Sequence, residues 1–438
     1  MENQDLSRRT LLKGGGAALA ELTVLRVTGL AQAFGDPGEE VIPWLDQPGP
    51  LPLPPTIVGN PLDWEKLDSW LTPAHNFFYV THYGIFQNAD PSTWRVDIRG
   101  LVARPQSLTL SDLKARARQE VDFTIECSGN EETPKDGFLS PLVGNGRWGG
   151  TPLAPLLEEA GLLRQATEVV FWGMDSGKVT IRDNFGIISG GKTGTIEPDG
   201  EGGSDLTITE HFARSMSVRD ALHPGNLLCY EMNGEPLLPE HGFPVRLIAP
   251  GWYGVANVKW LTRIDVLDHR FAGRFMARDY VSIREQQRDG ETVWTFTTVS
   301  HERLKSAPAK VTRRNGRYAV MGTAWGAPIS AVEVQVDEGP WIAARLERPP
   351  SIAAAEADDG PVTAEMDGDT AKHTRRRSYA WKFWRFEWGT PRPGEHKIRS
   401  RAFDVFGNVQ PTPDDPFLAS KRTFWENNGQ IARRVLIH

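Results

Sequence analysis

The change of residue pattern near residue 300 most constrains the fold of this 438-residue chain. Between Trp64 and about Asp268, short strand-like runs alternate with a few helical segments, which is typical of mixed α and β structure. From about Ser306 onward the pattern is almost purely β, with apolar alternation at 318–322, 329–336, 379–388 and 396–402. We therefore predict an α+β chain, with a mixed α/β domain over residues 64–300 and a β-sandwich over 306–438.

The clearest predicted helix lies in the first of these domains. Thr151 is expected as its N-cap, Pro152 as its first residue, and Gly161 as its end. Its buried face is carried by Leu153, Leu156, Leu157 and Ala160.

The N-terminus has the pattern of an export signal. Arg8 and Arg9 precede a weakly apolar Gly/Ala-rich stretch, and Ala31-Gln32-Ala33 is a small-x-small cleavage site. The pattern predicts a twin-arginine signal over residues 1–33 and a soluble, periplasmic mature protein. Because this route carries folded proteins, it also favours a cofactor inserted before export. Residues 34–63, rich in proline, are expected to form an extended arm over the protein.

Composition argues against several partners. The net charge of −7 and the lack of a sustained Lys/Arg stripe argue against nucleic acid. The chain has no Cys-x-x-Cys-His motif, so we expect no covalently attached haem on it.

One motif matches a nucleotide-binding pattern in letters alone. The run from Gly186 to Thr193 fits G-x-x-x-x-G-K-[ST], whose mechanism needs its lysine and threonine to open a helix. Residues 194–203 are rich in glycine and acids and include a proline, which disfavours that helix. We predict a glycine-rich loop and no bound nucleotide.

Cys127 is the residue on which the chemistry depends. It is one of only two cysteines, and it ends a strand-like run over residues 121–126, just before a Gly-Asn turn. The residues alone leave four interpretations open: a small buried hydrophobe, a disulfide with Cys229, a nucleophile, or a soft ligand for a redox-active metal. Cys229 lies in the apolar run 226–232, where burial in the core is the better interpretation.

Further segments follow Cys127 in a characteristic order. They are Asp175 within residues 171–177, a His-Gly-Phe-Pro-Val-Arg run at 241–246, and an Ala-Asn-Val-Lys-Trp-Leu run at 256–261. With the runs at 230–237 and 251–254, they resemble the molybdenum-containing sulfite oxidase family, from about Phe77 to the C-terminus. In that family one cysteine thiolate binds molybdenum, a molybdopterin dithiolene supplies two more sulfurs, and oxo or hydroxo groups complete the sphere. The resemblance thus implies that Cys127 is the metal ligand and sets the disulfide aside.

The resemblance also implies a set of residues that bind molybdopterin. A phosphate suits the guanidinium of Arg246 and the ammonium of Lys259, for which ordinary surface charge is the alternative. Asp175 would bond the pterin ring. His82 ends a run that matches the family's F-x-R-N-H only at Phe78 and His82, and a buried structural histidine is its alternative. The implied cofactor-binding residues are His82, Asp175, His241, Arg246, Asn257, Val258 and Lys259.

For the C-terminal half, the resemblance implies an Ig-like domain that forms a homodimer. The run from Ala380 to Trp384 resembles the end of the family's R-A-W-A-W-x-x-W motif, which puts Arg377 at the arginine that reaches the anion pocket. Residues 403–411 match a further C-terminal signature of the family.

The departures from the family concern the substrate. Where sulfite oxidases have two arginine positions and a tyrosine, this chain has Val80, Glu131 with Glu132, and Phe212. Each change of charge is worth on the order of 1 to 4 kcal/mol at short range, so binding of free sulfite should weaken. Arg214 and Arg377 are the expected compensating cations, and with Cys127 they make up the predicted catalytic set.

The resemblance implies an oxidoreductase that moves an oxygen atom and two electrons between water and a small sulfur oxoanion of the sulfite or sulfane type. Since no haem is expected on the chain, the electron acceptor would be a separate c-type cytochrome. One alternative is the reverse chemistry, reduction of a sulfoxide such as oxidised methionine in a less cationic pocket. Another is a cofactor-free protein that binds a partner through its sandwich.

Overall fold

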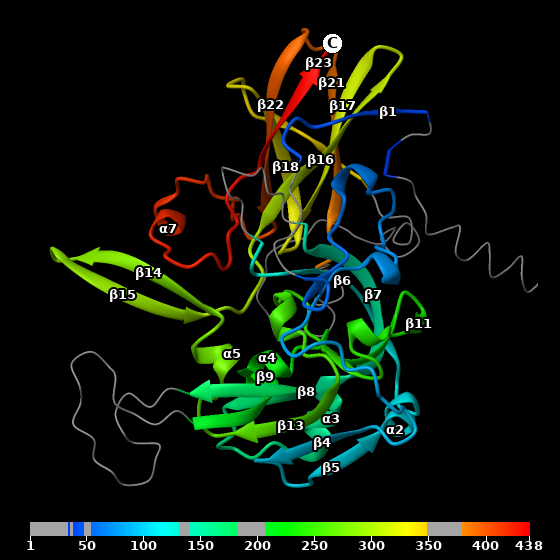
Figure 1. Ribbon diagram of the computed structural model, residues 1–438, viewed down its shortest axis with the longest axis vertical. Coiled ribbons are helices and arrows are strands. Elements are labelled where there is room, and N and C mark those ends of the chain that lie inside the picture. The colour runs from blue at the N-terminus through cyan, green and yellow to red at the C-terminus, as the bar shows by residue number, and fades with distance from the viewer. Residues whose placement is uncertain (1–33, 36–37, 48–53, 131–140, 182–205, 348–378) are drawn as a thin grey trace, which may run out of the picture.

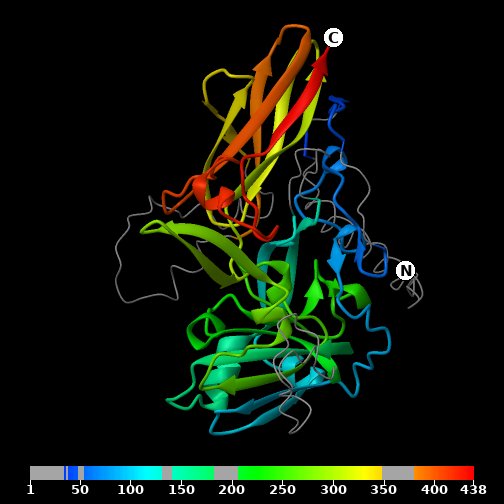
Figure 2. The same ribbon diagram turned by 60° about the vertical axis from the view of Figure 1, so that its left-hand side comes forward.

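The computed structural model describes residues 34–35, 38–47, 54–130, 141–181, 206–347 and 379–438. The predicted signal over 1–33, the run from Gly186 to Thr193, Glu131 with Glu132, and Arg377 lie outside these residues. Figures 1 and 2 show two bodies stacked along the long axis of the molecule, one from the middle of the chain and one from its C-terminal part. None of the described helices has the length and apolarity needed to cross a membrane.

The lower body in Figure 1, which we call the catalytic body, contains two sheets. In the first, of order β5-β4-β13-β8-β9, only β4 and β13 are parallel. Its strands are β4 (Arg95–Gly100), β5 (Gln106–Thr109), β8 (Glu168–Ile181), β9 (Leu206–Ser217) and β13 (Leu261–Leu267).

The second sheet of the catalytic body carries Cys127 at the end of a strand. Its order is β11-β10-β7-β6, and β12 also pairs with β10. The predicted strand 121–126 lies within β6, where it pairs in antiparallel register with β7. The strands are β6 (Gln119–Glu126), β7 (Val143–Pro152), β10 (Leu227–Met232), β11 (Glu235–Pro236) and β12 (Arg246–Ile248).

The helices of this body are short. The predicted helix is present as α3 (Leu153–Ala160), which ends at Gly161 with a φ of 73° and buries its four predicted apolar residues. Its N-cap differs from the prediction: Pro152 holds that position, because the Thr151 hydroxyl donates to the Leu113 carbonyl at 2.7 Å. The others are α2 (Leu110–Lys114), α4 (Val218–Ala221), α5 (Arg274–Ala277) and the 3-10 turns η1 (Trp64–Lys66), η2 (Ala74–Asn76), η3 (Pro239–His241) and η4 (Gly254–Ala256).

The upper body is a pair of antiparallel sheets around one apolar core. Val311 and Val320 from one sheet pack with Val334 and Ile398 from the other. The first sheet is ordered β1-β16-β17-β21-β20, from β1 (Glu40–Ile42), β16 (Lys305–Arg314), β17 (Arg317–Trp325), β20 (Arg345–Leu346) and β21 (Lys382–Gly389). The second is ordered β19-β18-β22-β23, from β18 (Ile329–Val336), β19 (Ile342–Ala343), β22 (Gly394–Asp404) and β23 (Ala432–Ile437). The two bodies, built mostly of strands with few helices, agree with the predicted two-domain chain. The α+β and Ig-like descriptions and the predicted domain boundaries stay predictions.

The two bodies share segments of chain. Strand β1, from the predicted arm, joins the upper sheet beside β16, and Trp44 is buried in the upper core. A short pair of β2 (Val58–Gly59) and β3 (Tyr79–Val80) then leads into the catalytic body. In the opposite direction, Tyr379 bridges to Phe123 of β6, so part of the C-terminal half completes the sheet that carries Cys127.

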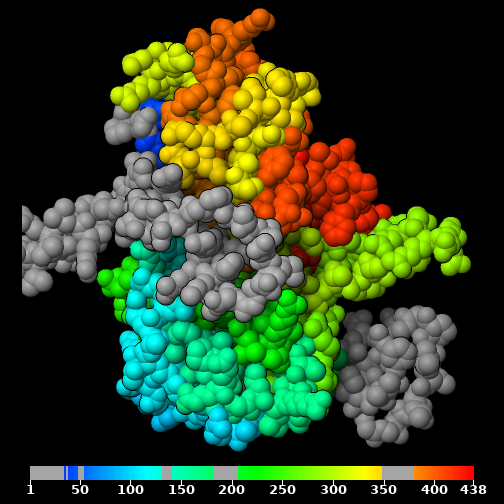
Figure 3. Space-filling view, turned by 180° about the vertical axis from the view of Figure 1, so that it is seen from behind, coloured from blue at the N-terminus to red at the C-terminus, as the bar shows by residue number. Residues whose placement is uncertain are grey.

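A two-stranded hairpin projects from the seam between the bodies. It consists of β14 (Val281–Arg288) and β15 (Glu291–Thr298). Figure 3, which views the molecule from behind, shows this hairpin extending beyond the rest of the protein. It lies next to the C-terminal segment that contains α7 (Pro416–Ala419). Arg422 N–H donates to the Ile283 carbonyl at 2.8 Å, so this segment holds the outer edge of β14.

Candidate functional site

A pocket enclosing about 680 Å³ of empty space opens in the catalytic body. Apolar and aromatic side chains with a few convergent polar groups line it, which is typical of sites for small organic ligands and cofactors. Its walls come from β3, the end of β6, the irregular middle of β8, β9, the start of β12, and the loops around η3 and η4. The lining residues are Phe77, Phe78, Tyr79, Val80, Thr81, His82, Ile125, Cys127, Asp175, Phe212, Glu240, His241, Arg246, Gly254, Val255, Asn257, Lys259, Trp260 and Tyr280.

Cys127 lines one end of this pocket, directly after β6. Its N–H donates to the Leu142 carbonyl at 2.9 Å, and its own carbonyl accepts from Asn130 N–H at 3.1 Å, which closes the predicted turn. Burial raises the pKa of the thiol to about 11, with the Gly129 N–H acting in the opposite direction. A bound cation would lower that pKa and favour the thiolate. Cys127 and Cys229 are both free thiols, so the disulfide alternative is excluded. Cys229, on β10, is buried in the hydrophobic core as predicted.

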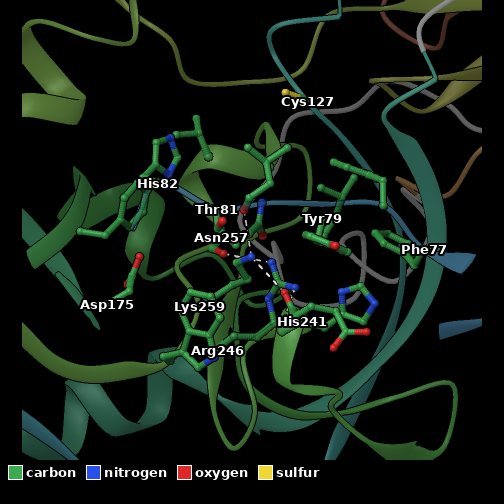
Figure 4. Close-up of a pocket in the computed structure, with 18 of the residues that line it drawn as sticks. Phe77, Tyr79, Thr81, His82, Cys127, Asp175, His241, Arg246, Asn257 and Lys259 are labelled. Carbon is green, nitrogen blue, oxygen red and sulfur yellow. Dashed lines mark hydrogen bonds between the residues drawn. The ribbon is translucent and has the colours of Figure 1, made fainter. Parts of the chain in front are cut away.

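The other end of the pocket is cationic, and Figure 4 shows Lys259, Arg246 and His241 gathered there, away from Cys127. Lys259 Nζ donates to the carbonyls of Val80 and Glu240, at 2.9 Å each. The guanidinium of Arg246 donates to the carbonyls of His241 and Asn257, at 3.0 Å each, and its Nε has no partner among the described residues. Burial lowers the pKa of Arg246 to about 10. Two cations held by carbonyls, neither in an ion pair with a carboxylate of the described residues, form a site for an anionic group.

Local backbone geometry makes this arrangement possible. Gly242 ends η3 with a φ of 97°, and a Cβ there would lie 2.9 Å from the Lys259 Cβ. The side chain of Asn257 accepts from Ala249 N–H and donates to the carbonyls of Trp252 and Tyr253, so it shapes the loop and offers the pocket its backbone. His241 Nε2 donates to the Ala74 carbonyl at 2.7 Å, and burial lowers the pKa of this imidazole to about 3. A neutral imidazole then donates to that carbonyl through Nε2.

Asp175 stands at the side of the pocket, apart from these cations in Figure 4. It is 7% exposed, and its Oδ1 has no hydrogen-bond partner among the described residues. Burial raises the pKa of this carboxyl, with the charge of Lys259 opposing, and burial lowers the pKa of Lys259. An unsatisfied buried carboxyl needs an external donor, and the N–H groups of a pterin ring would supply one.

His82 is placed by aromatic neighbours. Its ring stacks on Phe212 with centroids 4.8 Å apart, and its Nε2 lies 2.7 Å from the Tyr280 hydroxyl. Burial lowers the pKa of His82 to about 3 and raises that of Tyr280, so both are neutral at pH 7. Tyr280 also packs against Trp425, a residue of the C-terminal segment, with centroids 4.4 Å apart.

Two predicted residues do not face the pocket. Arg214 is 1% exposed, its guanidinium donates to the carbonyls of Phe275 and Val299, and it lines a neighbouring cavity instead. We therefore correct the prediction that Arg214 compensates for the missing substrate arginines. Its guanidinium N–H groups already donate to these two carbonyls. Val258 packs its side chain in the core of the catalytic body. Its backbone carbonyl accepts from Leu247 N–H at 2.8 Å.

Sequence reasoning missed several residues of the site. Tyr280, Glu240 and Thr81 line the pocket but carry no motif of their own. Thr81 and Glu240 are sequence neighbours of the predicted His82 and His241, which was the available signal. Tyr280 precedes the hairpin, and nothing in the local sequence indicates that it would meet His82.

The residues present fit molybdopterin. A thiol lies at one end of a single pocket, a cationic group at the other, and a buried unpaired carboxyl at the side. In molybdopterin, the metal would bind the thiol, the phosphate would bind the cationic group, and the N–H groups of the pterin ring would bind the carboxyl.

Comparison with known proteins agrees with this geometry. The model of the oxidoreductase molybdopterin-binding domain matches residues 82–187 and 192–275, and that of the Mo-co oxidoreductase dimerisation domain matches 292–424. These two matches define the chain as a molybdopterin-binding oxidoreductase. Mitochondrial sulfite oxidase of Drosophila melanogaster is 28% identical over 90% of this chain and 65% of its own length. The human enzyme is 29% identical over 78% of this chain and 58% of its own length.

Solved structures extend the likeness to the fold. The sulfane dehydrogenase SoxCD of Paracoccus pantotrophus has a TM-score of 0.64 and 22% identity, covering 91% of this chain and 90% of that one. The chain belongs to the sulfite oxidase family of molybdopterin oxidoreductases. It spans 58 to 65% of the length of the mitochondrial sulfite oxidases named above.

Proposed function

We propose that the protein is an exported enzyme that oxidises a small sulfur oxoanion, of the sulfite or sulfane type, with oxygen from water and passes the electrons to a c-type cytochrome. The observation that carries this proposal is the placement of Cys127 and of the Arg246 and Lys259 cations at opposite ends of one pocket. When bound, the molybdenum centre supplies the two-electron redox change and the transferred oxygen.

The side chains of this chain hold and isolate that centre. Arg246 and Lys259 would bind the phosphate, Asp175 the pterin ring, and Cys127 the metal. The aromatic rings of Phe77, Phe78 and Trp260, which all line the pocket, would exclude water from the bound group. His82 and Tyr280, both neutral, are hydrogen-bonded at 2.7 Å and line the same pocket as Cys127 without adding charge to it.

The reaction is best tested in both directions. Sulfite with oxidised cytochrome c, and a reduced dye with methionine sulfoxide, should be compared on one preparation of the enzyme. Turnover of sulfite supports the proposal. The reverse reaction alone would support the second candidate, a sulfoxide reductase, which the uncharged pocket wall formed by Val80 and Phe212 favours. Elemental analysis should give about one molybdenum and one phosphorus per chain, whereas neither would be found in a cofactor-free binding protein.

Export and assembly are also proposals. A homodimer through the C-terminal body is supported by the match of residues 292–424 to the dimerisation domain, and periplasmic location by the paired Arg8 and Arg9. Sedimentation of purified protein and fractionation of cells that express it test these two points.

For the substrate anion, Arg377 is the residue expected to bind it, although it lies outside the described residues. Arg377→Met should raise the Michaelis constant for sulfite by at least about tenfold, because loss of one partner of a buried charge-assisted bond costs roughly 2 to 5 kcal/mol. Steady-state kinetics measure this effect. Unchanged kinetics for the anion together with rapid turnover of a neutral sulfoxide would reverse the assignment of substrate.

A further inference from the structure

A second pair of cationic side chains, both arginines, lies at the seam between the two bodies. Arg284, on β14, is 3% exposed, and Arg303 precedes β16. Both point a guanidinium at Glu426, with Nη2 to Oε2 distances of 3.9 Å and 3.7 Å. The ring of Phe417 covers both cations, with its centroid 4.1 Å and 5.2 Å from their Cζ atoms.

The charges and hydrogen bonds of this cluster do not balance within the protein. Glu426 is nearer to Ser282, whose hydroxyl donates to it at 2.6 Å, than to either arginine. Arg284 donates to Thr297 at 3.1 Å, but its Nε and Nη2, and the Nε of Arg303, have no acceptor among the described residues. Two guanidinium groups therefore share one carboxylate at a loose distance. A buried cation in this situation is costly unless an anion completes its partners.

The cluster adjoins the Cys127 turn. Glu426 N–H donates to the Ser128 carbonyl at 2.8 Å, and a Cβ on Gly129 would meet Phe424 and Trp425 at 3.2 Å. On the other side, Tyr280 lines the pocket just before β14. A strand rises about 3.3 Å per residue, so the Arg284 backbone, four residues further along, lies about 13 Å from that of Tyr280. The arginines thus lie near the pocket but are not among the residues that line it.

We propose that Arg284 and Arg303 form an oxoanion-binding site at the domain seam, which takes a sulfur oxoanion before or after reaction. Guanidinium groups bind such anions through paired N–H donors. A cationic site beside a pocket also raises the local concentration of an anionic substrate. This concentration matters here because Val80 and Phe212 leave the adjacent pocket wall uncharged. The identification of the anion as the substrate's class rests on the proposed function, whereas the anion site itself does not.

The test uses the full, cofactor-loaded chain and sulfate as the probe. Isothermal titration at constant ionic strength should show saturable sulfate binding that sulfite displaces. Arg284→Gln and Arg303→Gln should each weaken this binding at least about tenfold, and the double variant should abolish it. Arg288→Gln is the matched control, since Arg288 lies on the same strand, exposed and bonded to Gln286. If Arg284→Gln does not fold, the more exposed Arg303, with 31% of its side chain accessible, provides the measurement.

Kinetics separate this inference from the proposed function. In an enzyme that oxidises sulfite, Arg303→Gln should raise the Michaelis constant and leave kcat near that of the wild type. No sulfate binding by the wild type, or equal binding by the double variant, would overturn the anion site while sulfite oxidation could still be observed. Sulfate binding lost in the double variant of a chain that never oxidises sulfite would sustain the anion site and reject the proposed function.

Discussion

Cys127 is the side chain that should decide activity at the scale of single residues. Cys127→Ser removes the one thiol that lines the pocket, yet leaves Arg246, Lys259 and Asp175 to hold molybdopterin. We expect loss of turnover, with a native unfolding midpoint and much of the pterin retained. Activity assays and pterin fluorescence measure the two effects. Cys229→Ser is the control and should stay active, because Cys229 is in the core; an active Cys127→Ser enzyme would reject the ligand assignment.

His241 should make the stability of the cofactor-free chain depend on pH. Burial lowers its pKa to about 3, against about 6.5 in the unfolded chain, so unfolding takes up a proton between these values. The contribution of His241 to the free energy of unfolding is full above pH 6.5 and decreases as the pH falls below that value. From pH 7.5 to 5.5 the wild type should lose about 1.4 kcal/mol through His241. Chemical unfolding at both pH values should show a correspondingly smaller loss for His241→Gln, and equal losses would contradict the prediction.

At the scale of elements, the end of β6 is fixed by a buried ion pair to β16. Lys305 Nζ lies 2.6 Å from Glu126 Oε1, with side-chain exposures of 1% and 0%, and Trp325 donates to the other oxygen at 2.9 Å. Lys305→Met would leave a buried charge unpaired, so we expect a loss of about 3 to 5 kcal/mol in the free energy of unfolding. Denaturant titration measures it.

The double variant Glu126→Gln with Lys305→Met is the matched control, because it removes both charges together. It should recover most of the lost stability. If the double variant were as unstable as Lys305→Met alone, the effect would come from lost packing and not from the unpaired carboxylate. Since Glu126 precedes Cys127, the molybdenum content of both variants should follow their stability.

At the scale of the whole molecule, the catalytic body depends on the C-terminal half. Trp381 N–H donates to Thr124 Oγ1 at 2.7 Å, and its indole donates to the Trp70 carbonyl at 2.9 Å, both in buried positions. A chain cut after residue 300 loses these contacts and the Glu126 ion pair. We expect it to be insoluble or free of molybdopterin. Expression with cofactor analysis tests this, a chain lacking only residues 1–33 is the control, and a soluble, loaded fragment would refute it.

Much of the fold and part of the site could be predicted from the sequence. The period of the apolar residues predicts β6, α3 and the strands of the upper body, because each depends on local alternation and on short-range caps. The order of Cys127, Asp175, His241, Arg246 and Lys259 implies the cofactor only through its resemblance to the family, and the structure gathers these residues around one pocket. Local pattern placed these residues on or beside strands and turns, and the resemblance supplied their roles.

Other features were decided by tertiary structure alone. Whether an arginine faces a pocket depends on the carbonyls that it meets: Arg214 meets those of Phe275 and Val299 and is withdrawn from the pocket. Pairing across the seam, as between Glu126 and Lys305, joins residues 179 apart in the chain. The cluster of Arg284, Arg303 and Glu426 has the same origin. No local pattern contains such pairings, because they form only when the C-terminal half folds back onto the turn that carries Cys127.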